Sequence, residues 1–323
     1  LVWTTRIGGK LRTVPVEALA EVGDAAVERL SAAVAVAKPE IGASEVARLV
    51  LTGVGYAAGV EFAGGGGGAL PDRPAPTTAE MRGLWFAGGP VAADAEAAAW
   101  CRSRGLDPAA LDDTGSARVM PATGAPGWAR SWARDGYRLL APLYGAGATL
   151  AAVRGRAVRP AEIKSRLPWG VDVAGLVLAD PAARAMMEGQ RTVREVWIAE
   201  GEVDVWTLAL ADLDALREGE LKPRHPSLRF AGAPWAVLGV VKGAWRAKEA
   251  GLELAKRIPA DVRILLATDK DKAGDAYAVE IAKAVRDVWP ERPVWRMVPP
   301  DPHKDWNEWW IERRSAASEV QRD

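Results

Sequence analysis

Cysteine and histidine are scarce in this chain of 323 residues. Cys101 is its one cysteine, and His225 and His303 are its two histidines. An internal disulfide is therefore excluded, and so is a cysteine-rich zinc site. This composition favours a cytoplasmic protein that uses no zinc.

Long apolar runs, a nucleotide-motor motif and net charge are also lacking. No stretch is apolar enough over a bilayer's thickness, and the first residues lack the order of a signal peptide, so we expect no membrane partner. The glycine run 64–68 is not followed by the Gly-Lys-Ser/Thr sequence that binds phosphates in nucleotide-driven motors. The 42 basic and 42 acidic residues cancel. A polyanionic partner would therefore have to be recognised by local charge.

The carboxyl-terminal half of the chain contains acidic residues directly after apolar runs. Residues 193–199 are β-branched and aromatic, which predicts a short buried strand that ends at Glu200. Apolar residues then recur at helical spacing from 203 to 216, which places Asp204 in the first turn of a helix. Glu200 and Asp204 therefore lie at a strand-to-helix junction.

The same pattern recurs twice further along the chain. The apolar run 262–268 predicts a strand that is followed by Asp269 and Asp271, and two acids two positions apart point to the same side of an extended segment. A strand predicted over 294–298 precedes the third acidic cluster, residues 304–308. An ordinary loop or helix cap is the alternative explanation for each acid taken alone.

Further predicted elements complete an α/β layer around these acids. A strand is expected over 235–240, and helices are expected over 243–258 and 273–289. Ligands of such folds bind beyond the carboxyl ends of the strands, where these acids lie. Grouped carboxylates without cysteine or histidine suit hard cations, so Mg²⁺ or Mn²⁺ is the expected cofactor.

The ordered set of motifs resembles the Toprim domain that primases, topoisomerases and some nucleases share. The motifs are Glu200-Gly201-x-x-Asp204, Gly239 after an apolar strand, Asp269-x-Asp271-x-x-Gly274 and Lys304-Asp305-x-Asn307-Glu308. The resemblance implies metal-dependent catalysis. The expected catalytic residues are Glu200, Asp269 and Asp271. The expected metal ligands are these three with Asp204 and Asp305. The glycines expected at structural turns are Gly201, Gly239 and Gly274.

A basic segment lies upstream of this domain, after two strands predicted on either side of the turn 145–147. It contains a single acid, Glu162, and its five cations are Arg154, Arg156, Arg159, Lys164 and Arg166. With Trp128, Trp132 and Trp169 nearby, these cations predict nucleic-acid or nucleotide binding. A solvated surface strand beside core tryptophans is the alternative.

The motifs Gly155-Arg156 and Lys164-Ser165 resemble the amino-terminal half of a primase catalytic core. That resemblance implies a basic groove that faces the Toprim metals, with the basic segment across from Asp269. Lys304 is expected either to neutralise phosphate or to anchor Asp305.

We expect a mixed α+β amino-terminal half followed by a Toprim-like Rossmannoid α/β domain. The predicted segments are a helical region without an assigned role (1–63), a Gly/Pro-rich linker (64–80), a primase-core subdomain (81–190), the Toprim domain (191–312) and a polar tail (313–323).

The resemblance implies a DNA primase of phage, plasmid or mobile-element type. Such an enzyme makes RNA primers from nucleoside triphosphates on single-stranded DNA, with any helicase supplied separately. Glu200 either binds a metal or takes the proton from the attacking 3′-hydroxyl, and the sequence leaves both roles open. A Toprim nuclease and a non-catalytic nucleic-acid-binding module remain as alternatives. A topoisomerase is disfavoured, because none of the four tyrosines lies in a recognisable strand-cleaving domain.

Overall fold

The chain forms two compact units, Leu1–Pro74 and Ala75–Asp323. The structure is a computed structural model, and it describes residues 2–7, 10–15, 75–190, 193–211, 235–241 and 248–320. In the first unit, β1 (Val2–Ile7) and β2 (Lys10–Pro15) pair antiparallel, with Val2 opposite Pro15. The helices predicted between residues 16 and 51, and the predicted linker up to residue 74, lie outside the described residues.

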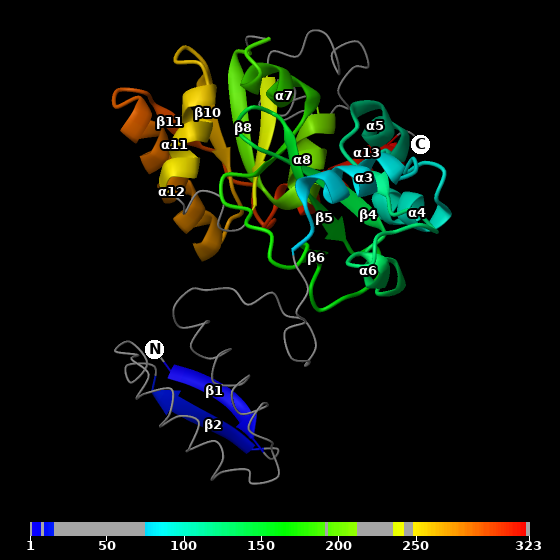
Figure 1. Cartoon of the computed structure of the whole chain (residues 1–323). Coiled ribbons are helices and arrows are strands. Elements are labelled where there is room, and N and C mark those ends of the chain that lie inside the picture. The colour runs from blue at the N-terminus through cyan, green and yellow to red at the C-terminus, as the bar shows by residue number, and fades with distance from the viewer. Residues whose placement is uncertain are drawn as a thin grey trace. The chain divides into compact units, whose positions relative to one another are not determined.

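A single mixed sheet forms the framework of the second unit (Figure 1). In spatial order its strands are β11 (Val294–Arg296), β10 (Arg263–Ala267), β8 (Glu195–Glu200), β9 (Trp235–Val240), β7 (Val177–Ala179), β4 (Leu139–Tyr144), β5 (Leu150–Arg156) and β6 (Ser165–Arg166), and β3 (Arg118–Val119) pairs with β4. Strands β11, β10, β8 and β9 are parallel, whereas the pairings from β9 through β7 to β6 are antiparallel. The predicted α/β class is confirmed.

The parallel strands form where the sequence is apolar without alternation. All six residues of β9 are buried, and so are the last four of β10, which is expected when helices cover both faces of a sheet. The antiparallel hairpin of β4 and β5 forms around the predicted turn, with Leu140 opposite Gly155. These two regions lie at opposite ends of the unit in Figure 1.

Helices pack around the sheet at both of its ends. Their bounds are α3 (Thr78–Ala87), α4 (Ala95–Ser103), α5 (Pro108–Thr114), α6 (Arg130–Arg134), α7 (Pro181–Met187), α8 (Gly201–Leu210), α11 (Lys248–Arg257), α12 (Lys272–Val288) and α13 (Trp306–Val320). A capping box between Thr77 and Glu80 starts α3, so regular structure begins inside the predicted linker 64–80. Helix α4 begins at Ala95, because the side chain of Asp94 accepts a hydrogen bond from the backbone N–H of Ala97.

Helix α13 connects the two ends of the unit. The indole Nε1 of Trp310 donates to the carbonyl of Gly105 at 2.8 Å, and Asn307 Nδ2 donates to the carbonyl of Arg104 at 2.9 Å. A polar tail was predicted from residue 313, but the helix α13 continues through these residues to Val320. Buried Trp306, Trp309 and Trp310 hold this helix in the core, so its first turns are fixed in place.

The segments 81–190 and 191–312 share the sheet. Strand β7 precedes residue 190 and pairs antiparallel with β9, with Leu178 opposite Gly239. The basic hairpin and the acidic strand ends are therefore parts of one hydrogen-bonded framework. A membrane-spanning helix is absent from the described part of the chain.

Candidate metal centre and its arginine network

The acidic residues gather where β8 and β10 end. These strands are parallel neighbours, with Ala199 opposite Ala267, so their carboxyl ends meet at one edge of the sheet. Glu200 is the last residue of β8, and the backbone N–H of Asp269 donates to its Oε1 at 3.1 Å. The prediction that the first two clusters share a strand edge agrees with this geometry.

Three glycines allow the backbone to form this edge. Gly201 has a φ of 64°, a left-handed conformation that lets the chain turn directly from β8 into α8. A Cβ on Gly239 would lie 2.3 Å from Val205, and one on Gly274 would lie 2.1 Å from the carbonyl oxygen of Asp269. Helix α8 therefore packs tightly on β9, and α12 starts directly against the Asp269 loop.

Asp269 is the carboxylate with the most unusual surroundings. Burial raises its pKa to about 7, and the negative charges of Glu200, Asp305 and Asp271 add to the shift. Its Oδ1 is buried and accepts no hydrogen bond from the residues that the structure describes. Burial likewise raises the pKa of Glu200, although the N–H of Asp269 opposes the shift. An unpartnered anionic oxygen of this kind favours the binding of a cation.

Asp271 is in the opposite condition. It caps α12 by accepting from the N–H of Gly274 at 2.9 Å, and the ammonium of Lys304 lies 2.9 Å from its Oδ2. Both contacts lower the pKa of Asp271, the backbone hydrogen bond more than Lys304. Asp271 is therefore a charged carboxylate that already has a cation beside it.

Asp204 and Asp305 both take part in hydrogen bonds that hold helices. Asp204 is buried and accepts from the backbone N–H of Asn307 at 3.0 Å, while Asp305 accepts from the N–H of Glu308 at 2.7 Å in the first turn of α13. Burial, together with the charges of Asp305 and Asp269, raises the pKa of Asp204 well above its usual value. The helix-cap interpretation of the third cluster therefore describes Asp305 in this structure.

Five expected metal ligands thus surround one edge without converging on one point. Within the part of the chain that the structure describes, no three His, Cys, Asp or Glu side chains meet in an arrangement that would hold a metal ion. The donors still fit a hard divalent cation, because all are carboxylate oxygens and none of the described residues donates to the buried Oδ1 of Asp269. Asp269, Asp271 and Glu200 are the residues that would hold such an ion.

Arg296 is a basic residue at this edge that the sequence analysis did not single out. Its guanidinium donates to the carbonyl of Asp269 at 2.9 Å and also pairs with Asp275 in the first turn of α12. It therefore fixes the backbone that carries Asp269. Its position at the end of the short strand β11 gives no local sequence signal for this role.

Glu202 is the other residue that the sequence analysis missed. It lies fully buried in α8, two residues after Glu200, with its carboxylate 2.9 Å from Arg156 and 3.4 Å from Arg154. Ser165 of β6 donates a further hydrogen bond at 2.5 Å. Burial alone would raise the pKa of Glu202, but the two guanidinium groups lower it to about 2.

Two of the predicted phosphate-binding arginines are therefore internal ion-pair partners. Arg156 also lies over the ring of Trp100, with its guanidinium carbon 5.3 Å from the ring centroid. Only about a fifth of the Arg154 side chain, and less of Arg156, is exposed. They connect β5 to the start of α8, while the expected groove between the basic segment and Asp269 stays a prediction.

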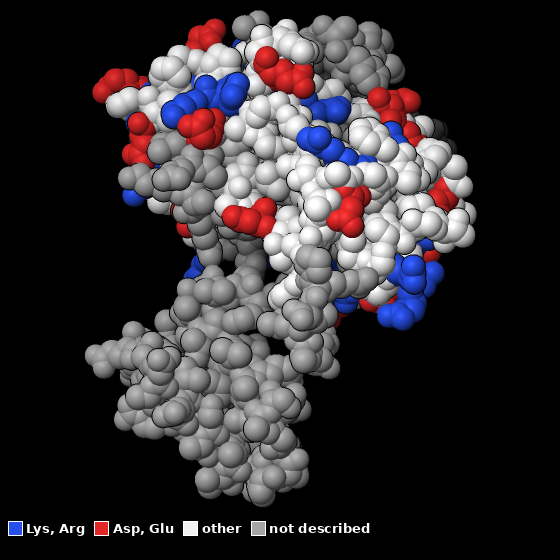
Figure 2. Space-filling model, in the orientation of Figure 1, with Lys and Arg blue, Asp and Glu red and all other residues white. Residues whose placement is uncertain are grey.

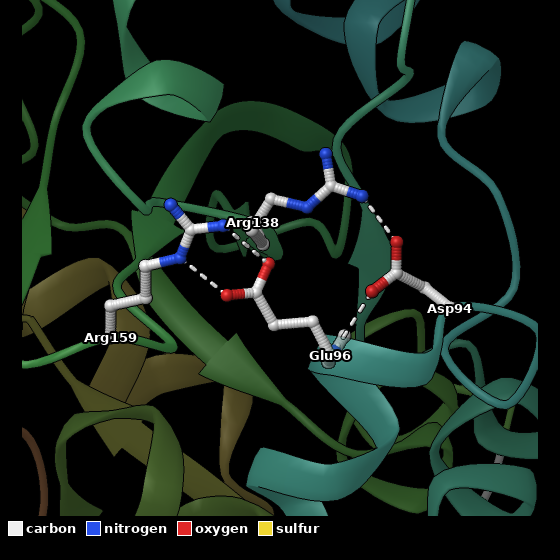
Figure 3. A network of polar contacts seen from close by, with 5 residues as sticks. Asp94, Glu96, Arg138 and Arg159 are labelled. Carbon is white, nitrogen blue, oxygen red and sulfur yellow. Dashed lines mark hydrogen bonds and ion pairs between the residues drawn. The ribbon is translucent and has the colours of Figure 1, made fainter.

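The remaining cations of the segment are nearer the surface. Figure 3 shows Arg159 facing Glu96, with a second ion pair between Arg138 and Asp94 beside it. Arg166 pairs with Asp135 at 2.8 Å.

Lys164 is exposed, and its ammonium contacts no acid among the described residues. On the face seen in Figure 2, Lys and Arg are interspersed with Asp and Glu and form no continuous basic surface.

The three tryptophans near the basic segment differ in exposure. Trp132 is buried, and a Cβ on Gly155 would lie 2.6 Å from its ring. Trp128 packs edge-on against Trp132, with 5.5 Å between the ring centroids. Trp169 is 44% exposed. The core interpretation therefore holds for Trp132, and Trp169 remains available for stacking on a base.

Comparison with known proteins supports the same domain. Residues 197–310 match the model of a family described as Toprim-like, which confirms the Toprim prediction for this segment. Glu200, Asp269, Asp271 and Asp305 all lie within it. No curated protein matches the chain.

Among solved structures, the chain is similar to the DnaG primase catalytic domain bound to ssDNA. The identity is 14% and the TM-score 0.49, over 76% of this chain and 77% of that one. It is also similar to the E. coli primase catalytic core, at 13% identity and TM-score 0.45, over 76% and 78%. A third is the primase fragment of the bacteriophage T7 primase-helicase protein, at 15% identity and TM-score 0.40, over 82% and 85%.

Proposed function

We propose that this chain is the catalytic core of a DNA primase, which joins nucleotides into short RNA primers on single-stranded DNA. The observation that carries the proposal is the buried ion-pair cluster of Glu202 with Arg154 and Arg156. It attaches the basic strand β5 two residues away from Glu200. A nucleic acid held along the basic segment would therefore lie beside the carboxylates of the Toprim-like domain.

The carboxylates at the strand edge have separate roles in this proposal. Asp269 and Asp271 hold Mg²⁺ or Mn²⁺, which when bound aligns the reacting oxygens and absorbs developing charge. Glu200 either completes the ligand set or accepts the proton of the 3′-hydroxyl on its carboxylate, and its raised pKa suits the second role. Lys304, which is largely exposed, faces the phosphates of the incoming nucleotide.

The partners follow from the same reaction. We propose single-stranded DNA as template, nucleoside triphosphates as substrates and a separate helicase that exposes the template. Lys164 and Trp169 contribute the free charge and the exposed ring for template binding. We expect the protein to act in the cytoplasm, in phage, plasmid or mobile-element replication.

A Toprim-type nuclease is the second candidate. The observation that favours it is that Arg154, Arg156, Arg159 and Arg166 are all paired with acids of this chain. Less free charge is then available to hold a template through several cycles of synthesis, whereas metal-dependent hydrolysis needs only brief contact. A non-catalytic module that binds nucleic acid is the third.

One assay separates the three functions. The full chain is incubated with single-stranded template, labelled ribonucleotides and Mg²⁺ or Mn²⁺. We expect products of a few nucleotides, and we expect Asp269→Ala to abolish them while its melting temperature shows that it is folded. The matched control is Asp301→Asn, because the Asp301 side chain is 89% exposed and pairs only with Lys270 among the described residues.

Degradation of the template, lost in the same variant, would instead support the nuclease. Binding of template without any metal-dependent product would support the non-catalytic module and overturn both enzyme proposals.

A further inference from the structure

Lys304 lies where its ammonium and a bound metal ion would compete for the carboxylate of Asp271. Its ammonium lies 2.9 Å from Oδ2 of Asp271, and the contact raises the pKa of Lys304. A little over half of the Lys304 side chain is exposed, and about a third of Asp271. The ion pair therefore lies at the surface of the edge, where either partner can exchange it for another ion.

The backbone of Lys304 is fixed, whereas a little over half of its side chain is exposed. The N–H of Lys270 donates to the Lys304 carbonyl at 2.8 Å, and the N–H of Lys304 donates to Glu308 Oε2 at 2.9 Å. The four-carbon stem extends from this anchored point. Its ammonium can therefore leave Asp271 without any change in the loop that carries it.

The two aspartates beside Lys304 are in complementary states. Oδ1 of Asp269 is buried without a hydrogen-bond partner in the described part of the chain, whereas Asp271 is neutralised by Lys304. Another cation that used both aspartates would have to displace the ammonium or share Asp271 with it. The displaced ammonium would stay close to the same edge, where the phosphates of a nucleotide would lie.

We propose that Lys304 is an exchangeable internal cation. It neutralises Asp271 before a divalent ion binds, and it moves from Asp271 to the triphosphate once the ion and the nucleotide are in place. This inference rests on the proposed function, because it takes the carboxylate edge as the metal centre. It predicts that Lys304 opposes metal binding and favours nucleotide binding, two effects of opposite sign from one side chain.

Lys270 provides a matched control. It lies between Asp269 and Asp271 in sequence, but its ammonium pairs with the exposed Asp301 and not with a candidate ligand. A general loss of positive charge would affect both lysines alike. A specific competition at Asp271 affects Lys304 alone.

The first test is calorimetric titration of Mn²⁺ into the full chain without nucleotide. We expect Lys304→Met to bind Mn²⁺ about tenfold more tightly than the wild type, because one positive charge beside the ligand is gone. Lys270→Met and Lys304→Arg should stay within about twofold of the wild type. If Lys304→Met binds as the wild type does, or if Lys270→Met gains as much, the inference is wrong.

The second test measures binding of a non-hydrolysable nucleoside triphosphate at saturating Mn²⁺. We expect Lys304→Met to weaken it about fivefold, the range of a charge-assisted contact at a surface. Unchanged nucleotide affinity would overturn the transfer of Lys304 to phosphate. A wild-type chain that binds no Mn²⁺ would overturn the metal centre itself, an outcome visible before any variant is compared.

Discussion

Two regions of the molecule differ in how far their charges are paired within the chain. One is the acidic edge, with the carboxylates at the ends of β8 and β10, and the other is the basic segment, with the arginines of β5 and β6. Burial raises the pKa values of Asp269, Glu200 and Asp204, and the negative charges of neighbouring acids add to the shift. Four arginines between 154 and 166 are each paired with a carboxylate from elsewhere in the chain. The acidic edge therefore holds carboxylates whose charged form is unfavourable, whereas four of the five cations of the basic segment are paired with acids of the chain.

This difference indicates where an external ligand contributes most. A cation bound at the acidic edge relieves repulsion that the fold leaves uncompensated. A phosphate bound at the paired arginines must instead compete with carboxylates that already satisfy them. We therefore expect a cation to bind more favourably at the acidic edge than a phosphate at the paired arginines of β5.

The largest effect is expected from breaking the arginine network. Glu202→Gln leaves Arg154 and Arg156 without their buried counter-charge, so we expect a loss of about 3–5 kcal/mol in the free energy of unfolding. Urea denaturation measures it. Because the folded pKa of Glu202, about 2, lies below its usual value, this stabilisation is present above about pH 4.5 and is lost as the pH falls towards 2. A loss below about 1 kcal/mol would contradict a buried network.

An intermediate effect is expected when the pH is changed, because the affinity of the acidic edge for a cation depends on the protonation of Asp269. Because the pKa of Asp269 is raised to about 7, the affinity for Mn²⁺ should increase about tenfold between pH 6 and pH 8 as that carboxyl loses its proton. Without a divalent ion, the pH dependence of the free energy of unfolding has the opposite sign. The raised folded pKa stabilises the chain at low pH, and the contribution is lost as the pH rises to about 7.

Titration calorimetry at several pH values measures this dependence. The Asp301→Asn variant should show the same pH dependence as the wild type. Asp301 is exposed, is not an expected ligand, and is not among the groups that shift the pKa of Asp269. An affinity that is flat across this range would contradict the raised pKa and remove the contrast between the two regions.

The smallest effect is expected at the surface pairs of the basic segment. Glu96→Gln breaks the ion pair with Arg159, in which both side chains are more than a third exposed. We expect the melting temperature to change by less than about 2 °C, because exposed pairs contribute little. Differential scanning calorimetry with and without 0.5 M salt, which shortens the Debye length to about 4 Å, checks it. A large shift would mean that the ion pairs in Figure 3 contribute substantially to the stability of the fold.

Local sequence patterns were sufficient to predict the strands that carry the acids. Strand β9 was expected over 235–240 and is Trp235–Val240, because an unbroken apolar run of that length is typical of a buried parallel strand. The acids after β8 and β10 were located for the same reason. Adjacent parallel strands end at the same edge of a sheet, so the acids that follow β8 and β10 lie close together in space although they are far apart in the sequence.

The partners of the basic segment were not predictable from local sequence. Arg156 meets Glu202 46 positions away, and Arg159 meets Glu96 63 positions away. Only the tertiary fold, which brings Arg156 of β5 to α8 and Arg159 to α4, decides these pairs. The same holds for the shared sheet, because the three-residue β7 has no signal strong enough to predict that it would pair with both β4 and β9.

The continuous sheet also limits how the protein can move. Strand β7 joins β4 to β9 through backbone hydrogen bonds, so the basic hairpin and the acidic edge cannot swing apart as two hinged domains would. Any closure around a substrate must come from side chains and from the loops that leave the strand ends. The spacing between the basic hairpin and the acidic edge is then set by the number of strands between them rather than by a conformational equilibrium.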